Sequence, residues 1–276
     1  MTTEVKQSDQ KRSITKVDDP SKRTRRKRCC RETSMKMIRS PPVMFPLQKL
    51  YLTCLDAFKG VGTVPSPSDD QKLRHVIDGL MPEDFELPRN LQFLDPDSTV
   101  VVYTSVYQCQ NFSIYILLLP GNAVIPLHNH PGMTVFSKVL LGKVHVKAYD
   151  LVNPHIVDNP PSLSQLKLAC LKVDKVFTSR CNTSVLYPTS GGNIHAFTAI
   201  TPCMILDVVG PSYSKKDGRD CSYYKEIPYI VSQYEQMTMP KEDGKCYRWL
   251  EEIEKPKESE IDRIEYLGPQ IVEISP

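Results

Sequence analysis

The sequence lacks several features that would assign a chain quickly to a class of protein. No run approaches about 18 consecutive apolar residues, so we expect no transmembrane helix. No apolar secretion segment precedes the nine cysteines, and the chain has no CxxC pair and no internal repeat. Scattered cysteines in odd number predict an intracellular protein with reduced thiols.

Charge is distributed unevenly along the chain. Residues 1–40 hold 13 Lys/Arg against 5 Asp/Glu, a net charge of +8, whereas the remaining residues hold 22 against 27, a net charge of −5. The segment 1–43 is polar and poor in aromatic residues, which predicts a disordered basic tail. Its Lys22–Arg28 run fits either a nuclear localisation signal or a solvated tail. The acidic remainder has no helix-turn-helix or zinc-finger pattern, so we expect no direct nucleic-acid binding and favour a monomer.

Residues 44–276 are interpreted as one domain that begins with two short helices. Apolar residues recur at helical spacing over 47–58, and a second helix is predicted from Asp69 to about Leu80, with Ser68 as its N-cap. From about residue 99, short segments rich in β-branched and aromatic residues alternate with turn residues, which is typical of an all-β sandwich or barrel. The predicted strands are 99–108, 111–119, 134–141, 143–150, 166–171, 175–178, 184–187, 194–200 and 203–209, followed by a short helix near 247–253 and an edge strand at 270–274.

The chemically informative pattern is His128-x-His130. Side chains two residues apart on an extended strand point to the same face, about 6.6 Å apart along the backbone. Both imidazoles can therefore reach one metal ion, while Asn129 points away. Pro126 and Pro131 bracket the pair, which fits a strand end.

A third histidine follows in comparable surroundings. Gly191 and Gly192 predict a tight turn just before the strand that carries His195. A small barrel would bring this histidine to the same internal point as the first two. A single histidine is more often a buried or surface residue than a ligand, but three in these contexts favour a metal site.

These segments resemble the two motifs of the cupin family. The His-x-His pair, with Gly142 twelve residues after His130, is similar to the first motif, and Pro188–His195 is similar to the second. The usual cupin Glu, three or four residues after the second His, is replaced by Thr134 and Val135. The chain thus offers three neutral imidazoles and no carboxylate ligand, a departure that is typical of thiol dioxygenases.

The closer resemblance is to the plant cysteine oxidase family, which is related to animal aminothiol dioxygenase. It covers most of the chain, from roughly residue 45 to the C-terminus. It implies an all-β, cupin-type fold, a jelly-roll barrel also described as a double-stranded β-helix. The segments that carry the resemblance are Pro126–Met133, Gly142–Tyr149, Gly191–His195 and Ile205–Val209.

The resemblance also implies an activity. His128, His130 and His195 would hold Fe(2+), although imidazole suits zinc and copper as well. Three neutral ligands leave the charge of the metal uncompensated, so a bound thiolate would supply negative charge. Such enzymes use O2 to convert the N-terminal cysteine of a protein to the sulfinic acid. The implied substrates are group VII ethylene-response transcription factors, whose oxidation feeds an N-degron pathway, so the chain would sense oxygen in the cytoplasm and nucleus.

Four further residues are candidates for the site. Asp207 lies in an apolar strand, where a carboxylate needs a partner, and the resemblance implies that it accepts from a ligand histidine or orients the substrate amine. Tyr213, Cys221 and Tyr223 lie in a loop that the resemblance places at the mouth of the site. Tyr213 would donate a hydrogen bond to bound dioxygen or substrate. Cys221 and Tyr223 look like the Cys-x-Tyr of the animal relative, where a cross-link can form.

The other residues of interest have simpler interpretations. We expect His75, His145 and His155 to lie at the surface, and Trp249 to be a packing residue. Two alternative functions stay open at this point: a dioxygenase of free cysteine or cysteamine, and a metal-binding cupin without turnover. A 2-oxoglutarate oxygenase is disfavoured because its His-x-Asp pattern is absent.

Overall fold

The computed structural model describes residues 45–87, 100–152, 166–227 and 246–274, except for the side chain of Glu258. Contacts between residues divide the chain into two units, Met1–Val43 and Met44–Pro276. The predicted disordered tail and His155 lie outside the described residues. Within the described ranges, no helix is long and apolar enough to cross a membrane.

Two helices begin the described part of the chain, and each starts at a proline. They are α1, Pro46–Ala57, and α2, Pro67–Asp78, followed by the 3-10 turn η1, Pro82–Phe85. The prediction of two helices is confirmed, but the predicted cap of α2 was wrong. Ser66 accepts the backbone N–H of Asp69 at 3.2 Å, because the fixed φ of Pro67 starts the helix before Ser68.

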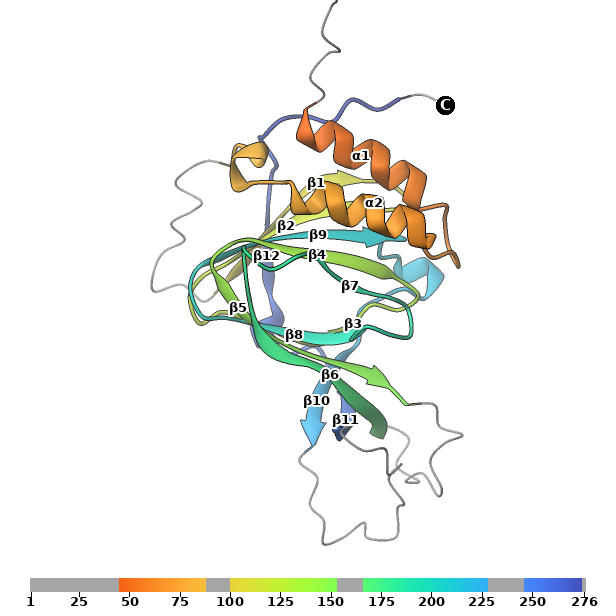
Figure 1. Ribbon diagram of the computed structural model, residues 1–276. Coiled ribbons are helices and arrows are strands. Elements are labelled where there is room, and N and C mark those ends of the chain that lie inside the picture. Colours follow the sequence, from red (N-terminus) through yellow and green to blue (C-terminus); the bar gives the residue numbers. More distant parts are fainter. Residues whose placement is uncertain (1–44, 88–99, 153–165, 228–245, 275–276) are drawn as a thin grey trace, which may run out of the picture. The chain divides into compact units, whose positions relative to one another are not determined.

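The strands form a six-stranded sheet and a closed barrel (Figure 1). The order in the sheet is β12-β1-β2-β9-β4-β7, and the order in the barrel is β10-β11-β6-β5-β8-β3. This confirms the predicted all-β class with short N-terminal helices. The strands are β1 Val101–Gln108, β2 Ser113–Leu119, β3 Val124–Asn129, β4 Thr134–Leu141, β5 Lys143–Leu151, β6 Leu166–Thr178, β7 Ser184–Leu186, β8 Ile194–Ala199, β9 Cys203–Gly210, β10 Tyr223–Ile227, β11 Tyr247–Ile253 and β12 Ile261–Ile264.

The six-stranded sheet is covered on both faces. One face packs against the barrel strands through apolar side chains such as Ile125, Val144 and Ile205. The helices cover the other face, as Figure 1 shows, where Phe58 stacks on Phe112 with ring centroids 5.9 Å apart. As a result β9, in the middle of the sheet, is buried at every residue. The one charged residue of that strand, Asp207, is therefore buried too.

Four predicted elements differ from the structure. The segment 247–253 is strand β11 rather than a helix, because it pairs with both β6 and β10 and this tertiary pairing outweighs its helix-favouring Leu and Glu residues. The predicted strands 166–171 and 175–178 are one continuous strand, β6. No strand forms at 270–274 in the described structure, and the sheet edge is β12, which pairs in parallel with β1.

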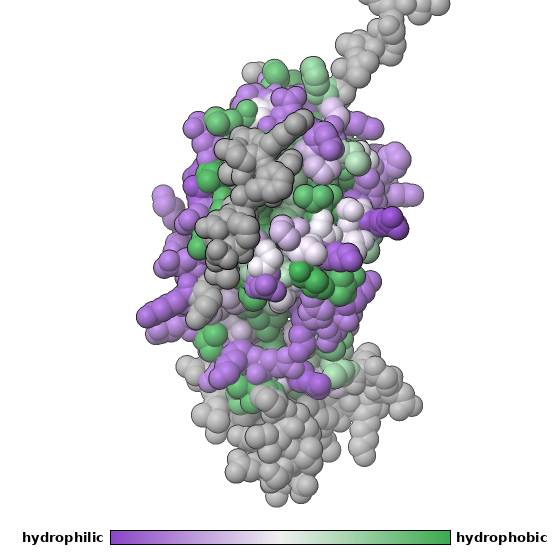
Figure 2. All heavy atoms as spheres, turned by 90° about the vertical axis from the view of Figure 1, so that its left-hand side faces the viewer, coloured by the Kyte–Doolittle hydropathy of each residue, from purple (hydrophilic) through white to green (hydrophobic). Residues whose placement is uncertain are grey.

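The surface residues agree with the expected locations. His75 is exposed, and His145 is half-exposed and bonded to Asp174, while Trp249 is buried. The cysteines of the described ranges are all unpaired, and Cys54, Cys170 and Cys203 are buried. In the face shown in Figure 2, the apolar residues that are not grey lie in small separate groups among hydrophilic ones.

Candidate metal centre

Three histidines meet at the place where the barrel closes. His128 lies in β3, opposite His195 of β8, and it also pairs with Tyr223 of β10. His130 follows two residues later, at the end of β3. The candidate ligand nitrogens of all three lie within 4.8 Å of one another, and His130 and His195 are buried. The predicted convergence of the three imidazoles is therefore present in the structure.

The three imidazoles fit a divalent metal. Burial lowers the pKa of His128, and burial together with neighbouring histidines lowers the pKa of His130 and His195 well below the usual value. The rings are therefore neutral at neutral pH and have free lone pairs. The Nε2 atoms of His130 and His195 are 3.0 Å apart, which matches two neighbouring metal–imidazole bonds of about 2.0–2.1 Å.

Hydrogen bonds fix which ring nitrogen faces the cluster. The Nδ1 atom of His128 lies 2.8 Å from the carbonyl oxygen of Pro126, to which Nδ1–H donates. This leaves Nε2 of His128 free as the ligand atom. In the same way, Nδ1 of His130 lies 2.6 Å from the hydroxyl oxygen of Tyr213. Tyr213 thus touches the back of a ligand ring, a contact that the sequence did not indicate.

Tyr213 is half-buried in a small apolar cluster with Met133 and Val209. Burial, reinforced by the charge of Asp207 among others, raises the pKa of its hydroxyl well above the ordinary value. The phenol therefore stays protonated. If His130 binds metal through Nε2, its Nδ1–H donates to the Tyr213 oxygen, and the proton of Tyr213 is free to be donated elsewhere.

Asp207 lies beside this cluster, paired in register with Ser137 of β4 and Tyr115 of β2. Burial raises the pKa of its carboxyl to about 6, an effect that the Ser137 side chain partly offsets. Its Oδ1 atom is buried without a hydrogen-bond partner among the described residues. The structure thus leaves one buried acceptor near Tyr213, and the role of Asp207 in the site stays a prediction.

Of the other two candidates, Cys221 lies in the loop that follows β9, whereas Tyr223, which was expected in the same loop, is the first residue of β10 because it pairs with His128 of β3. Cys221 and Tyr223 are both half-buried, and their side chains interact with each other. Burial raises the pKa of the Cys221 thiol to about 11 and also raises the pKa of Tyr223. The centroid of the Tyr223 ring lies 6.5 Å from that of the His128 ring, so Tyr223 borders the centre, and the role of the pair at a site mouth stays a prediction.

The structure reveals contacts around the centre that sequence reasoning missed. Asn129, which points away from the histidines as expected, binds Ser222: its Oδ1 accepts the Ser222 N–H at 2.8 Å. Asn193 binds the backbone of His130, and Asp150 accepts three backbone N–H groups of the turn before His195. Only the position of Asn193, between a double glycine and a ligand, could have drawn attention to it.

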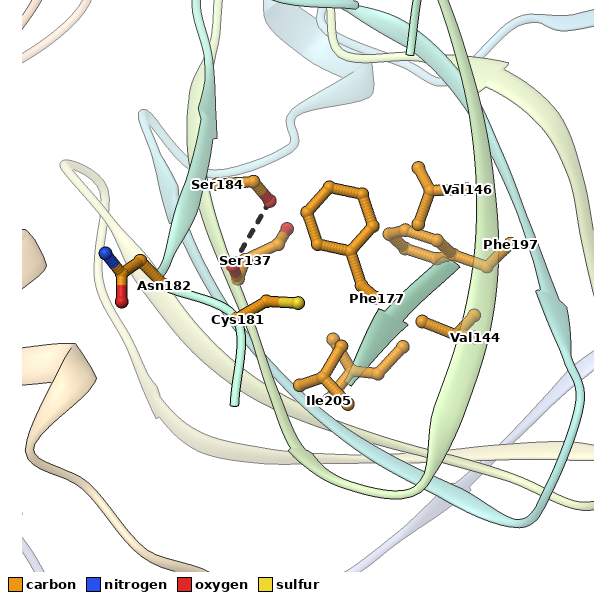
Figure 3. Close-up of a pocket in the computed structure, with 10 residues that line it drawn as sticks. Ser137, Val144, Val146, Phe177, Cys181, Asn182, Ser184, Phe197 and Ile205 are labelled. Atoms are coloured by element: carbon orange, nitrogen blue, oxygen red, sulfur yellow. Dashed lines mark hydrogen bonds between the residues drawn. The ribbon is translucent and has the colours of Figure 1, made fainter. Parts of the chain in front are cut away.

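Two small cavities lie between the sheet and the barrel beside the centre. One, of about 30 Å³, reaches His195, and the other, of about 10 Å³, lies near Cys181. Figure 3 shows Phe177 and Phe197 facing the second cavity from the barrel side. Neither cavity can hold more than about one or two water-sized molecules.

A family model described as PCO_ADO matches residues 76–271. The chain belongs to the PCO_ADO family. It is 43% identical over 235 residues to plant cysteine oxidase 2 of Arabidopsis thaliana, and this match covers 83% of this chain and 84% of that protein. It is 30% identical over 180 residues to 2-aminoethanethiol dioxygenase of Homo sapiens, which covers 58% of this chain and 66% of the human protein.

The predicted resemblance to plant cysteine oxidases is thereby confirmed for this PCO_ADO member. Solved structures add more distant matches. An RmlC-like cupin from Shewanella frigidimarina is 15% identical and covers 44% of this chain and 84% of its own, with a TM-score of 0.31. A protein with a double-stranded β-helix domain from Klebsiella pneumoniae is 13% identical. The match covers 48% of this chain and 90% of that protein, also with a TM-score of 0.31.

Proposed function

We propose that this protein is an iron(II)-dependent thiol dioxygenase that uses O2 to oxidise the N-terminal cysteine of proteins to the sulfinic acid. The observation that carries the proposal is a cluster of three neutral imidazoles, two of them buried and one half-buried, with no carboxylate in the cluster among the described residues. The cluster lies in a chain that is 43% identical to plant cysteine oxidase 2. A carboxylate-free site leaves room for a negatively charged thiolate.

The histidines are the residues that would hold the iron. Their neutral state allows them to bind a metal ion without first releasing protons. Bound iron would supply the redox chemistry that joins O2 to a thiolate sulfur. Both oxygen atoms of one O2 enter the product, since a thiol plus O2 equals a sulfinic acid, and no further cofactor is required.

Tyr213 and Asp207 are proposed to act on the substrate and on dioxygen. Tyr213 accepts from His130, which frees its own proton for donation to bound O2 or substrate. The unpartnered Oδ1 of Asp207 would accept a hydrogen bond from the substrate amine. A free amine next to the thiol is the feature that distinguishes an N-terminal cysteine from an internal one, so Asp207 would contribute to selectivity.

Cys221 and Tyr223 are proposed to form one wall of the substrate entrance. The proposal is supported by the position of Tyr223 beside His128, by the contact between Tyr223 and Cys221, and by the partial burial of both side chains. The cavity of about 30 Å³ at His195 is too small for a peptide, so we propose that a chain terminus approaches from the side of Cys221 and Tyr223. Their raised pKa values keep both groups protonated and uncharged at neutral pH.

The proposal extends to the cellular role. We infer that the substrates are group VII ethylene-response transcription factors and that the reaction is the oxygen-sensing step of an N-degron pathway in the response to hypoxia. The basic run Lys22–Arg28 supports a protein that acts in both cytoplasm and nucleus. These inferences rest on the relatives and on the sequence of the N-terminal tail.

Mass spectrometry of a peptide that begins with cysteine tests the proposal. After incubation with iron-loaded protein in air, we expect a gain of about 32 Da on the N-terminal cysteine. The gain should be absent when the peptide amine is acetylated. Oxidation of cysteamine or free cysteine, without oxidation of the peptide, would instead assign a small-thiol dioxygenase. If no thiol is oxidised while iron is bound, the protein is a metal-binding cupin.

A further inference from the structure

Asn193 touches both chain segments that carry the histidines. It lies two residues before His195, and its side chain binds the backbone of His130 on two atoms. Oδ1 of Asn193 accepts the His130 N–H at 3.1 Å, and Nδ2 donates to the His130 carbonyl oxygen at 2.9 Å. Nδ2 also donates to the carbonyl oxygen of Tyr187 at 2.9 Å. Asn193 is buried, so none of these bonds is shared with bulk water.

These hydrogen bonds extend the pairing of β3 and β8 by one residue, to His130. The ladder ends at the pair Asn129 and Ile194, and the next antiparallel pair would be His130 and Asn193. A carboxamide offers a donor next to an acceptor, as a peptide group does. The side chain of Asn193 can therefore replace its own backbone as the partner of His130. The backbone N–H of Asn193 is used elsewhere, since it donates to Asp150.

Asp150, near the end of β5, holds the turn that presents Asn193. Its buried carboxylate accepts the N–H groups of Gly191 at 3.0 Å, Gly192 at 2.8 Å and Asn193 at 3.1 Å. Successive backbone N–H groups that face one anion form a nest. Gly192 has φ of 89°, and a Cβ there would lie 2.6 Å from the Cβ of Ala148. The turn is thus held against β5, which carries both Asp150 and Ala148.

We propose that Asn193, held by Asp150, is a positioning residue for the metal centre that fixes the direction of the His130 imidazole relative to His195. A side chain bonded to both backbone polar atoms of His130 restricts rotation about the backbone of that residue. The turn at His130 has one further bond, from the Met133 N–H to the same carbonyl oxygen. The inference rests on the metal site of the proposed function but not on its substrate or reaction.

Metal titration tests this role. Metal-free, full-length protein is titrated with Co(2+), whose visible absorption reports binding and ligand geometry. We expect Asn193→Ala to weaken Co(2+) binding by about 10- to 100-fold and to change the absorption bands. Asn193→Asp keeps the size and the acceptor but loses both donors, so it should weaken binding as well. Asp150→Asn should have a smaller effect in the same direction, because the turn loses part of its anchor.

Asp78→Asn is the matched control. The Asp78 carboxylate accepts the N–H and the hydroxyl of Thr183, both at 2.7 Å, which is the same kind of contact in a loop without metal ligands. We expect its Co(2+) affinity to stay within about twofold of the unmodified protein. Unchanged affinity and absorption in folded Asn193→Ala would overturn the proposal, as would an equal loss in Asp78→Asn.

Hydrogen exchange keeps the proposal testable if the Asn193 variants do not fold. In the unmodified protein, Co(2+) should slow exchange at the amides of His130 and of residues 191–193, because the metal couples these segments. Exchange that the metal leaves unchanged there would contradict the proposal. Co(2+) binding needs no turnover, so a protein that binds Co(2+) as expected but oxidises no thiol would refute the proposed function and leave this inference intact.

Discussion

At the scale of single residues, the charge state of the three imidazoles decides the chemistry of the centre. His130 and His195 are buried and His128 is half-buried, and the pKa values of all three are lowered, so protons do not compete with a metal at neutral pH. A carboxylate ligand would partly neutralise the charge of a bound metal. Without one, a bound thiolate can supply that negative charge. This explains in physical terms why the missing Glu after His130 is informative.

Removal of one imidazole should weaken metal binding. We expect His195→Ala, purified and loaded with iron, to bind metal at least about tenfold more weakly than the unmodified protein. Metal content by plasma mass spectrometry measures this. His145→Ala is the control, because His145 is half-exposed and bonded to Asp174 rather than to the cluster. An equal loss of metal in both variants would contradict the assignment of the centre.

Tyr213 should act on turnover rather than on metal binding. Tyr213→Phe removes the hydroxyl that contacts His130 but keeps the ring in its apolar cluster. We expect kcat to fall by about 10- to 100-fold while iron content stays unchanged. Steady-state oxygen consumption with a cysteine-initiated peptide measures this. Tyr115→Phe removes a hydroxyl from the same cluster and should change kcat little; a similar loss in both variants would refute a specific role for Tyr213.

Asp207 should destabilise the fold as pH rises. In the folded protein the pKa of its carboxyl is raised to about 6, above the ordinary 3.8, so the folded state binds this proton more tightly than the unfolded state. The stability that this residue contributes below pH of about 4 is therefore lost as pH rises through about 6. The side chain of Asp207→Asn cannot ionise. As pH rises over this range, the free energy of unfolding of this variant should therefore increase relative to that of the unmodified protein, by up to about 3 kcal/mol.

Denaturant unfolding of the metal-free proteins at pH 4 and pH 7.5 measures the effect of Asp207. Asp56→Asn serves as the control, since Asp56 is exposed to water. The difference in free energy of unfolding between Asp207→Asn and the unmodified protein should grow with pH. If it does not, folding leaves the proton affinity of Asp207 unchanged, which contradicts the raised pKa that burial produces.

At the scale of elements, the loop after β9, which we propose borders the substrate entrance, is tied to the strand that carries His128. Asn129 links the two, since its Oδ1 accepts the Ser222 N–H at 2.8 Å and its backbone N–H donates to the Ser222 carbonyl oxygen at 3.1 Å. This places Cys221 and Tyr223 at a fixed position beside His128. The loop is therefore held by a residue that sits between two ligands.

Loss of this link should weaken substrate binding without loss of metal. We expect Asn129→Ala to raise the KM for a cysteine-initiated peptide by about tenfold, because the loop loses a partly buried hydrogen bond to the ligand strand. Iron content should stay unchanged. Asn182→Ala, at an exposed position, is the control. A loss of iron in Asn129→Ala with unchanged KM would show that Asn129 supports the ligands and not the loop.

Local sequence patterns predicted the helices and strands in which apolar residues recur at regular spacing. They missed elements whose structure depends on pairing with residues distant in the sequence. Helices and most strands were found because apolar residues recur at their periods, and the three histidines because their spacing on strands is local. The segment 247–253 was assigned to a helix because nothing local records its pairing with β6 and β10. Asp150 was missed for the same reason, since its partners lie 41 to 43 residues away.

At the scale of the whole molecule, the described side chains of the core and of the metal centre all belong to the unit Met44–Pro276. We therefore expect a chain that starts at Met44 to keep kcat/KM for the peptide within about twofold. Its net charge becomes negative, because the tail holds the excess of Lys and Arg. A large loss of activity in the folded, truncated protein would show that the tail takes part in catalysis or substrate binding.

The central claim is that both oxygen atoms of one O2 are transferred to the sulfur of an N-terminal cysteine at the three-histidine centre. Incubation of the iron-loaded protein and a cysteine-initiated peptide under ¹⁸O2 in ordinary water tests it most directly. We predict a mass gain of about 36 Da, against about 32 Da in ordinary oxygen, and no gain with His195→Ala. A product with only one labelled oxygen atom, or with oxygen from water alone, would contradict the account.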